Sequence, residues 1–162
     1  MMIDERQKRI NAHEIECRRY AEKAVQQLFS ACTLVNGKDT PIKCHVDYRA
    51  TGETKSGKIQ TIDIEVKTIS PEYAEKGTPL KVRKYRNMRK DQKNQLLIYL
   101  SVESDGTAYV YNLTSIDLER QAKHTIWNIK EVEWLKDSPK KPTPMYIIPK
   151  QLANYKLKIK LD

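Results

Sequence analysis

The first part of the chain repeats apolar residues at helical spacing on a charged background. Residues 4–31 contain no glycine or proline. Most apolar positions there are three or four apart, namely Ile10, Ile15, Tyr20, Ala21, Ala24, Val25, Leu28 and Phe29. This spacing gathers them on one side of a helix and leaves the charged residues on the other. The pattern predicts a long amphipathic helix.

The spacing then changes from helical to alternating. Turn residues at 36–39 and Pro41 precede an expected extended segment over residues 42–50. Two glycines among polar residues at 51–57 indicate a hairpin connection into residues 58–69. That last segment is the clearest strand in the chain. Its alternation puts one set of side chains on one face, Ile62, Ile64 and Val66, and another set opposite, Asp63, Glu65 and Lys67.

The second half of the chain predicts one more helix and several strands. Residues 70–79 are expected to form a loop, after which Val82, Tyr85 and Met88 recur at helical spacing. Strands are predicted at 94–102 and 107–113, and a short helix with a Thr or Ser cap at 114–122. Beyond it we expect a strand at 126–135, extended pieces between prolines, and an edge strand where Lys156, Lys158 and Lys160 alternate with apolar residues.

Composition limits the class of protein. With 162 residues, 39% hydrophobic and 31% charged, the chain has the size and apolar content of one folded domain, residues 1–162. Its apolar runs are too short to cross a bilayer and its start lacks a signal core, so no membrane partner is expected. Three cysteines without a CxxC pair argue against a disulfide framework and favour the cytoplasm.

The positive charge is concentrated in one segment. The chain carries a net charge of +9, and residues 76–93 hold eight basic residues against Asp91 alone. A polyanion such as a nucleic acid is therefore the partner to test first. The simpler alternative is a solvated helix face. If the helix binds nucleic acid, its phosphate contacts are expected to come from Arg83, Lys84, Arg86, Arg89 and Lys90.

Three residues in the predicted hairpin suggest hydrolytic chemistry. Glu65 and Lys67 share a strand face, and Asp47 lies in the strand before it, so the three can converge. Two carboxylates on rigid strands can bind Mg²⁺ or Mn²⁺ through oxygen ligands. A neighbouring lysine can orient water or stabilise charge that develops on a phosphate. A solvated strand face of alternating charge is the alternative explanation of the same triplet.

The run Ile62-Asp63-Ile64-Glu65-Val66-Lys67-Thr68, with Asp47 before it, resembles the PD-(D/E)XK nuclease superfamily. The resemblance covers about residues 14–113 and leaves 114–162 as an extension of uncertain role. It implies an α/β restriction-endonuclease-like core, in which a mixed central sheet is flanked by helices in the order αβββαβ. It also implies metal ligation by Asp47 and Glu65 and assistance by Lys67 in the attack of water.

The resemblance suggests further residues and also has departures. Members often add a glutamate from the first helix, where Glu22 is the candidate and Glu14 and Glu16 are weaker ones. Gln95 with Tyr99 resembles the QxxxY motif of some exonuclease branches. The proline that precedes the aspartate in the family name is replaced here by Val46, and Asp63 competes with Asp47 as the second carboxylate.

The sequence therefore predicts a metal-dependent nuclease, for which DNA is favoured over RNA as the substrate but both are left open. The alternatives are a non-catalytic nucleic-acid-binding module, a structural partner with a degenerate nuclease fold, and a basic protein-interaction domain. A zinc site from His13, Cys17 and Cys44 is disfavoured because standard ligand spacing is missing. Trp127 and Trp134 could stack on bases, but aromatic residues more often belong to the core. Strandedness and oligomeric state are left open, although nucleases that cut two strands often act as homodimers.

Overall fold

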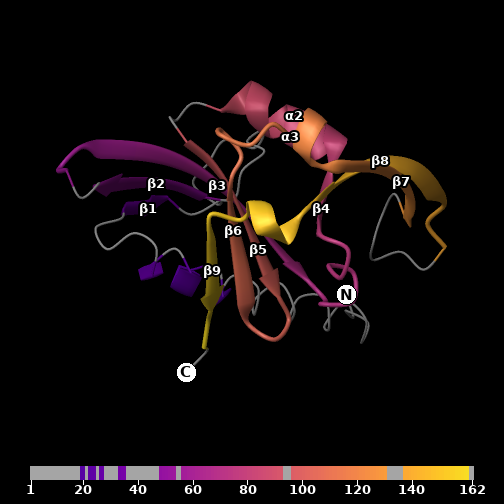
Figure 1. Ribbon diagram of the computed structural model, residues 1–162, viewed down its shortest axis with the longest axis horizontal. Coiled ribbons are helices and arrows are strands. Elements are labelled where there is room, and N and C mark those ends of the chain that lie inside the picture. Colours follow the sequence, from indigo (N-terminus) through magenta and orange to yellow (C-terminus); the bar gives the residue numbers. More distant parts are fainter. Residues whose placement is uncertain are drawn as a thin grey trace, which may run out of the picture.

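The computed structural model describes residues 19–20, 22–24, 26–27, 33–35, 48–53, 56–92, 96–130 and 137–160. In this part of the chain it is a mixed α/β structure, made mostly of strands in two sheets (Figure 1). Asp47, Gln95 and the predicted strand segment 42–47 lie outside the described residues. So do Glu14, Glu16 and the discounted zinc ligands.

The main sheet contains six strands and is mixed. Its order is β1-β2-β3-β5-β6-β9. The strands are β1 (Thr33–Val35), β2 (Tyr48–Glu53), β3 (Ile59–Ile69), β5 (Leu96–Glu103), β6 (Thr107–Asn112) and β9 (Tyr155–Lys158). Only the β3–β5 pair is parallel, and the other pairs are antiparallel. The β2–β3 hairpin, β5, β6 and the lysine-rich edge strand β9 confirm the sequence predictions, although β2 extends through residues 51–53, where the hairpin connection was expected.

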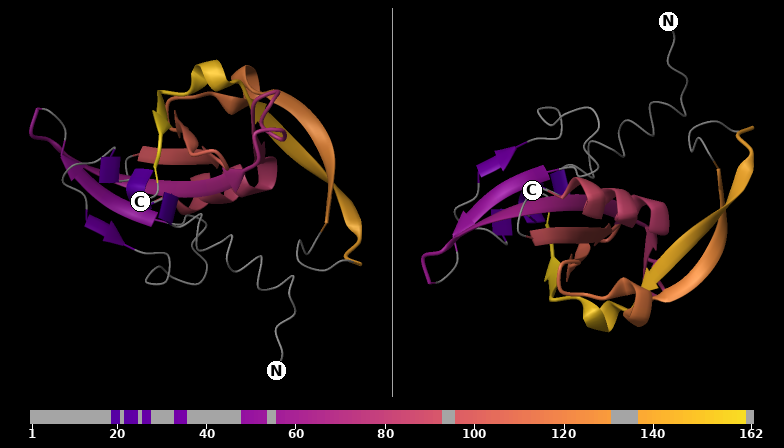
Figure 2. Two further views of the ribbon diagram at one scale, coloured as in Figure 1. Left: turned by 90° about the horizontal axis from the view of Figure 1, so that it is seen from below. Right: turned by 90° about the horizontal axis from the view of Figure 1, so that it is seen from above.

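A second sheet stands against one end of the first. It contains β4 (Thr78–Lys81), β8 (Lys140–Ile148) and β7 (Lys123–Lys130), in the antiparallel order β4-β8-β7. Figures 1 and 2 show the β7–β8 ribbon extending away from the main sheet. Gly77 precedes β4 at φ +132°, and a Cβ there would lie 2.7 Å from the Ile148 carbonyl oxygen. Only glycine fits this close approach to β8.

The helices are few and short in the described part of the chain. Residues 19–27 are helical where they are described, in agreement with part of the predicted first helix. Helix α2 (Val82–Asp91) confirms the predicted basic helix. Helix α3 (Leu118–Gln121) begins later than predicted, and its cap is Asp117, whose side chain accepts a hydrogen bond from the Arg120 amide. The expected Thr or Ser cap was wrong. A 3₁₀ turn, Lys150–Leu152, precedes β9. No described helix has the length and apolarity needed to span a membrane.

Both faces of the main sheet are covered. Ile62 and Ile64 of β3 pack on one side with Ala24 of the first helical segment. On the other side, Leu97 and Tyr99 of β5 pack with Met88 of α2 and with residues of β8. The face of β3 that carries Asp63 and Glu65 is therefore an interior face, where Asp63 is 0% and Glu65 9% exposed. The predicted alternation holds, but this face is buried at Asp63 and Glu65 and reaches solvent only further along, at Lys67.

Candidate active site

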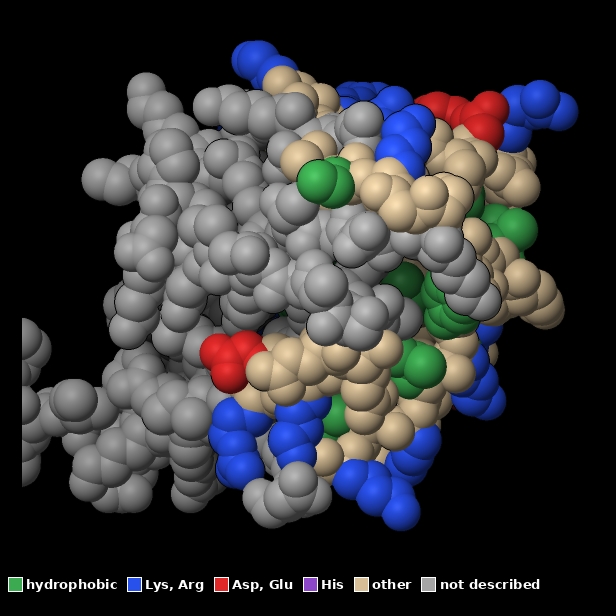
Figure 3. Space-filling model, turned by 90° about the vertical axis from the view of Figure 1, so that its left-hand side faces the viewer, with side chains coloured by type: hydrophobic (Ala, Val, Ile, Leu, Met, Phe, Trp, Pro, Cys, Tyr) green, Lys and Arg blue, Asp and Glu red, His purple; other side chains and the backbone are tan. Residues whose placement is uncertain are grey.

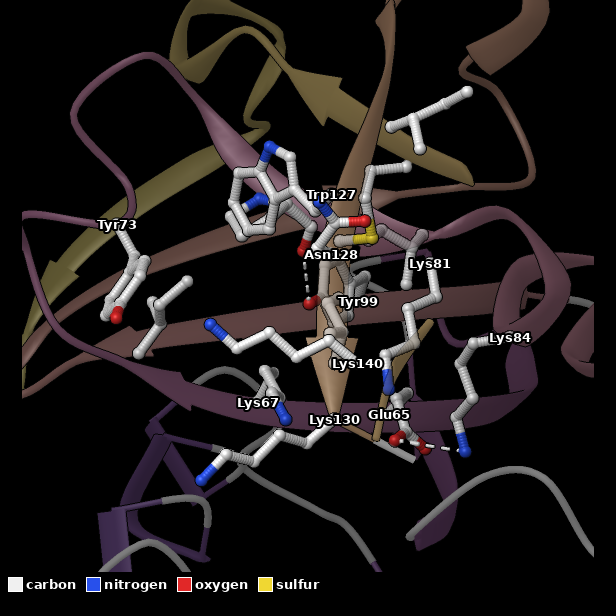
Figure 4. A pocket seen from close by; sticks show the side chains of 16 residues that line it. Glu65, Lys67, Tyr73, Lys81, Lys84, Tyr99, Trp127, Asn128, Lys130 and Lys140 are labelled. Carbon is white, nitrogen blue, oxygen red and sulfur yellow. Dashed lines mark hydrogen bonds and ion pairs between the residues drawn. The ribbon is translucent and has the colours of Figure 1, made fainter. Parts of the chain in front are cut away.

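Strand β3 brings Glu65 and Lys67 to one pocket. The two residues lie one pleat apart and pair in register with Tyr99 and Ser101 of β5. Both line a pocket of about 920 Å³ between the end of the main sheet and the β7–β8 ribbon (Figure 4). The predicted convergence of Glu65 and Lys67 is thus present in the structure.

The pocket wall is strongly cationic. Five lysines, each from a different element, line it, namely Lys67, Lys81, Lys84, Lys130 and Lys140. Among the described lining residues, Glu65 is the carboxylate that faces them. Figure 3 shows Lys and Arg side chains at several separate places on another side of the molecule. A cleft lined by one sign of charge concentrates the field and attracts anions.

Lys84 holds Glu65 in an ion pair. The Lys84 Nζ lies 3.3 Å from Glu65 Oε1, and the two side chains are 35% and 12% exposed. Figure 4 shows the ammonium reaching from α2 toward the carboxylate on β3. Solvent at Lys84 screens the pair in part, so its main effect is to orient Glu65. Lys84 is the residue of the predicted phosphate-binding set that lines this pocket.

The other four pocket lysines are not held in this way. Within the described part of the chain, no carboxylate lies at ion-pair distance from Lys67, Lys81, Lys130 or Lys140. Lys130 and Lys140 are directly opposite each other in the β7–β8 register. Like charges at such positions destabilise a strand pair. An anion bound between these lysines would relieve the repulsion.

Two buried tyrosines fix the pocket wall to the main sheet. Tyr99 Oη donates a hydrogen bond to the Pro79 carbonyl oxygen at 2.9 Å, and Thr78 Oγ1 shares one with Tyr111 Oη at 2.7 Å. Burial raises the pKa of the Tyr111 hydroxyl to about 12, although the bond to Thr78 acts in the opposite direction. The bonds hold β4 on β5 and β6 and thereby place Lys81 and the start of α2.

The remaining predicted site residues are placed elsewhere. Glu22 is exposed and does not line the pocket, and its helical segment packs on the opposite face of the sheet through Ala24. Asp63 shares the face of Glu65 but is fully buried and does not reach the pocket. On α2, four predicted phosphate contacts are exposed outside the pocket, namely Arg83, Arg86, Arg89 and Lys90.

Several pocket residues were not identified from the sequence. Lys81, Lys130 and Lys140 complete the basic wall, and Tyr73 and Trp127 give it aromatic surface beside Tyr99, the tyrosine of the QxxxY resemblance. The ribbon residues come from the extension whose role was uncertain. The available signal was the presence of Trp127 and Lys130 in one predicted strand, but no local pattern showed that this strand faces β3.

The described residues supply part of a metal-ligand set. Glu65 presents a carboxylate, which is a suitable oxygen ligand for Mg²⁺ or Mn²⁺. Asp47, the other predicted ligand, lies outside the described residues. Among the residues that are described, no three His, Cys, Asp or Glu side chains gather in a metal-binding group.

The chain was compared with protein-family models, with curated proteins and with solved structures, and none of the three comparisons finds a match.

Proposed function

We propose that the protein is a metal-dependent nuclease that hydrolyses phosphodiester bonds in DNA. The observation that carries the proposal is the meeting of Glu65 and Lys67 in one pocket with four further lysines. A carboxylate suits a divalent cation, and the lysines suit a polyanionic backbone. The pocket therefore combines a candidate hydrolytic group with a surface complementary to its substrate.

The order of elements supports the resemblance to PD-(D/E)XK nucleases. The described helical residues between 19 and 27 are followed by β1, β2 and β3, then by α2 and β5. This is the αβββαβ order, with β4 added before α2 to join the second sheet. The Glu65–Lys67 motif lies on the third strand of that order, within a mixed sheet. The restriction-endonuclease-like core remains part of the proposal.

Glu65 and Asp47 would hold the metal. Asp47 directly precedes Tyr48 in the sequence, and Tyr48 pairs with Ile64, the neighbour of Glu65. When bound, Mg²⁺ would lower the pKa of a coordinated water and polarise the phosphodiester. Glu22 is the least supported member of the predicted set because it does not line the pocket.

The pocket lysines Lys67 and Lys84 would have separate roles in the reaction. Lys67, one pleat from Glu65, would stabilise negative charge that develops on the phosphate oxygens. Lys84 would position the Glu65 carboxylate, with which it is ion-paired. The exposed basic residues of α2 would bind the phosphate backbone outside the pocket without reading sequence.

The test is cleavage of linear, circular and single-stranded DNA and of RNA by the purified protein, with Mg²⁺, Mn²⁺ or EDTA. We expect cleavage with either metal and none with EDTA. Asp47→Ala and Glu65→Gln should abolish cleavage and leave binding largely intact. Cleavage that persists in EDTA, or in both variants, would remove this mechanism.

A non-catalytic nucleic-acid-binding module is the second candidate. The Glu65–Lys84 ion pair favours it, because the pair occupies one oxygen of the carboxylate, Oε1, without any metal. This candidate predicts salt-sensitive binding and no cleavage under any metal condition.

A further inference from the structure

The lysine pocket also has an apolar wall. Tyr73 and Ile126 line it, and each is 67% exposed. Trp127 lies beside Tyr73, with ring centroids 6.5 Å apart and planes tilted by 50°. Neither aromatic residue belongs to the two buried core clusters among the described residues. The Tyr73 ring is exposed, Trp127 is half-buried beside it, and both line the pocket.

The basic and aromatic side chains lie on opposing sides of the same space. Figure 4 shows Trp127 and Tyr73 above the amino groups of Lys140, Lys67 and Lys130. This arrangement matches the two parts of a nucleotide, because phosphates require cations and the faces of bases stack on aromatic rings. A simple phosphate site would not require the exposed rings.

The combination distinguishes a single strand from a duplex. In a duplex the faces of the bases are covered by stacking on one another, and only their edges and the backbone are accessible. A single strand presents unstacked base faces together with its phosphates. The β7–β8 ribbon extends away from the main sheet (Figure 2), and residues of both sheets line the pocket.

We infer that this pocket binds a single-stranded segment of nucleic acid, with bases stacked on Trp127 and Tyr73 and phosphates held by Lys67, Lys130 and Lys140. The inference specifies the substrate of the proposed nuclease and rests on that proposal for its chemistry, but binding can be measured separately. The β7–β8 ribbon is then the element that selects single strands.

The experiment measures binding without cleavage. Fluorescence anisotropy in EDTA compares a labelled 12-nucleotide single-stranded DNA, the RNA of the same sequence and the 12-base-pair duplex. We expect at least one of the two single strands to bind about tenfold or more tightly than the duplex. The affinities of the single-stranded DNA and the RNA then show whether the pocket prefers deoxyribose or ribose. Equal or tighter binding of the duplex would overturn the inference.

Two variants of Trp127 separate base stacking from electrostatic attraction to the phosphates. Trp127→Ala should weaken single-strand binding about tenfold, in line with the loss of one stacked base, and leave the salt dependence unchanged. Trp127→Phe should retain most of the affinity. The matched control is Tyr155→Ala, which removes an exposed aromatic residue of β9 outside the pocket and should have no effect. Equal losses in Trp127→Ala and Tyr155→Ala would contradict the inference.

Tryptophan fluorescence tests base stacking without the alanine variant. The chain has two tryptophans, so Trp134→Phe leaves Trp127 as the single reporter. Stacking of a base should quench its fluorescence on addition of the single strand but not of the duplex. Absence of quenching at saturating single strand would overturn the inference. Single-strand preference without cleavage in Mg²⁺ would remove the proposed nuclease and leave this inference standing.

Discussion

The two lysines of the β7–β8 ribbon give the prediction with the best defined magnitude. Lys130 and Lys140 face each other in register and line the pocket, so replacing both with Met removes two cations from its wall. Because like charges opposite each other destabilise a strand pair, the double variant should fold as well as the parent. Its effect should therefore lie in binding.

The expected size follows from counterion release. Each phosphate of a single strand that is neutralised contributes about 0.7 to the slope of log K against log [salt], so the double variant should lower the slope by about 1.4. Between 50 and 200 mM salt, that difference means that the parent loses roughly sevenfold more affinity than the variant. Phosphate contacts made by α2 contribute equally to the slopes of the parent and of the double variant, so they cancel when the two slopes are compared.

Anisotropy titrations at four or five salt concentrations measure this slope. The control is the double variant of Lys123 and Lys141, two exposed lysines of the same strands that do not line the pocket. Its slope should match that of the parent. Equal slopes for the parent and the Lys130 and Lys140 variant, or an equal reduction in the control, would refute the pocket as the phosphate site.

Three predictions concern the scaffold. Met88→Ala on α2, whose side chain is fully buried, should lower the free energy of unfolding by about 2–5 kcal/mol in urea titrations, and an unchanged midpoint would contradict the packing. Tyr111 has a pKa raised from 10.0 to about 12, so its stabilising contribution is complete below pH 10 and is lost as pH rises to 12. Stability should fall by about 2 kcal/mol more in the parent than in Tyr111→Phe between pH 9 and pH 11.5. Asp117→Ala should destabilise by about 1 kcal/mol through loss of the α3 cap, and Asp117→Asn should preserve it.

The strands and α2 could be predicted because their patterns are local. The alternation in β3 and the helical spacing of Val82, Tyr85 and Met88 depend only on neighbours in the sequence. For the same reason Glu65 and Lys67 were found on one face. Local patterns did not reveal that Asp63 and Glu65 on this face are buried. Their cover comes from α2 and from β8, and β8 begins at Lys140, whereas β3 ends at Ile69.

The second sheet required long-range pairing that no short pattern encodes. Strand β4 has four residues and contains Pro79, and its first two residues lie in the segment 70–79 for which the sequence predicts a loop. Its partner is β8, which itself contains Pro142 and Pro144. The pocket lies between β3 and this sheet, so the contributions of Lys130, Lys140 and Trp127 depended on the same pairing. The basic segment drew attention to α2, although Lys84 alone of its five predicted phosphate contacts lines the pocket.

The central claim is that the Glu65–Lys67 pocket hydrolyses nucleic acid. Its most direct test is single-turnover cleavage in Mg²⁺ by the parent, by Lys67→Ala and by the control Lys123→Met, each at saturating protein. We predict metal-dependent cleavage that falls about 10²–10³-fold in Lys67→Ala, as expected for loss of one group that stabilises transition-state charge, and is unchanged in Lys123→Met. Cleavage by Lys67→Ala at the rate of the parent would contradict the account.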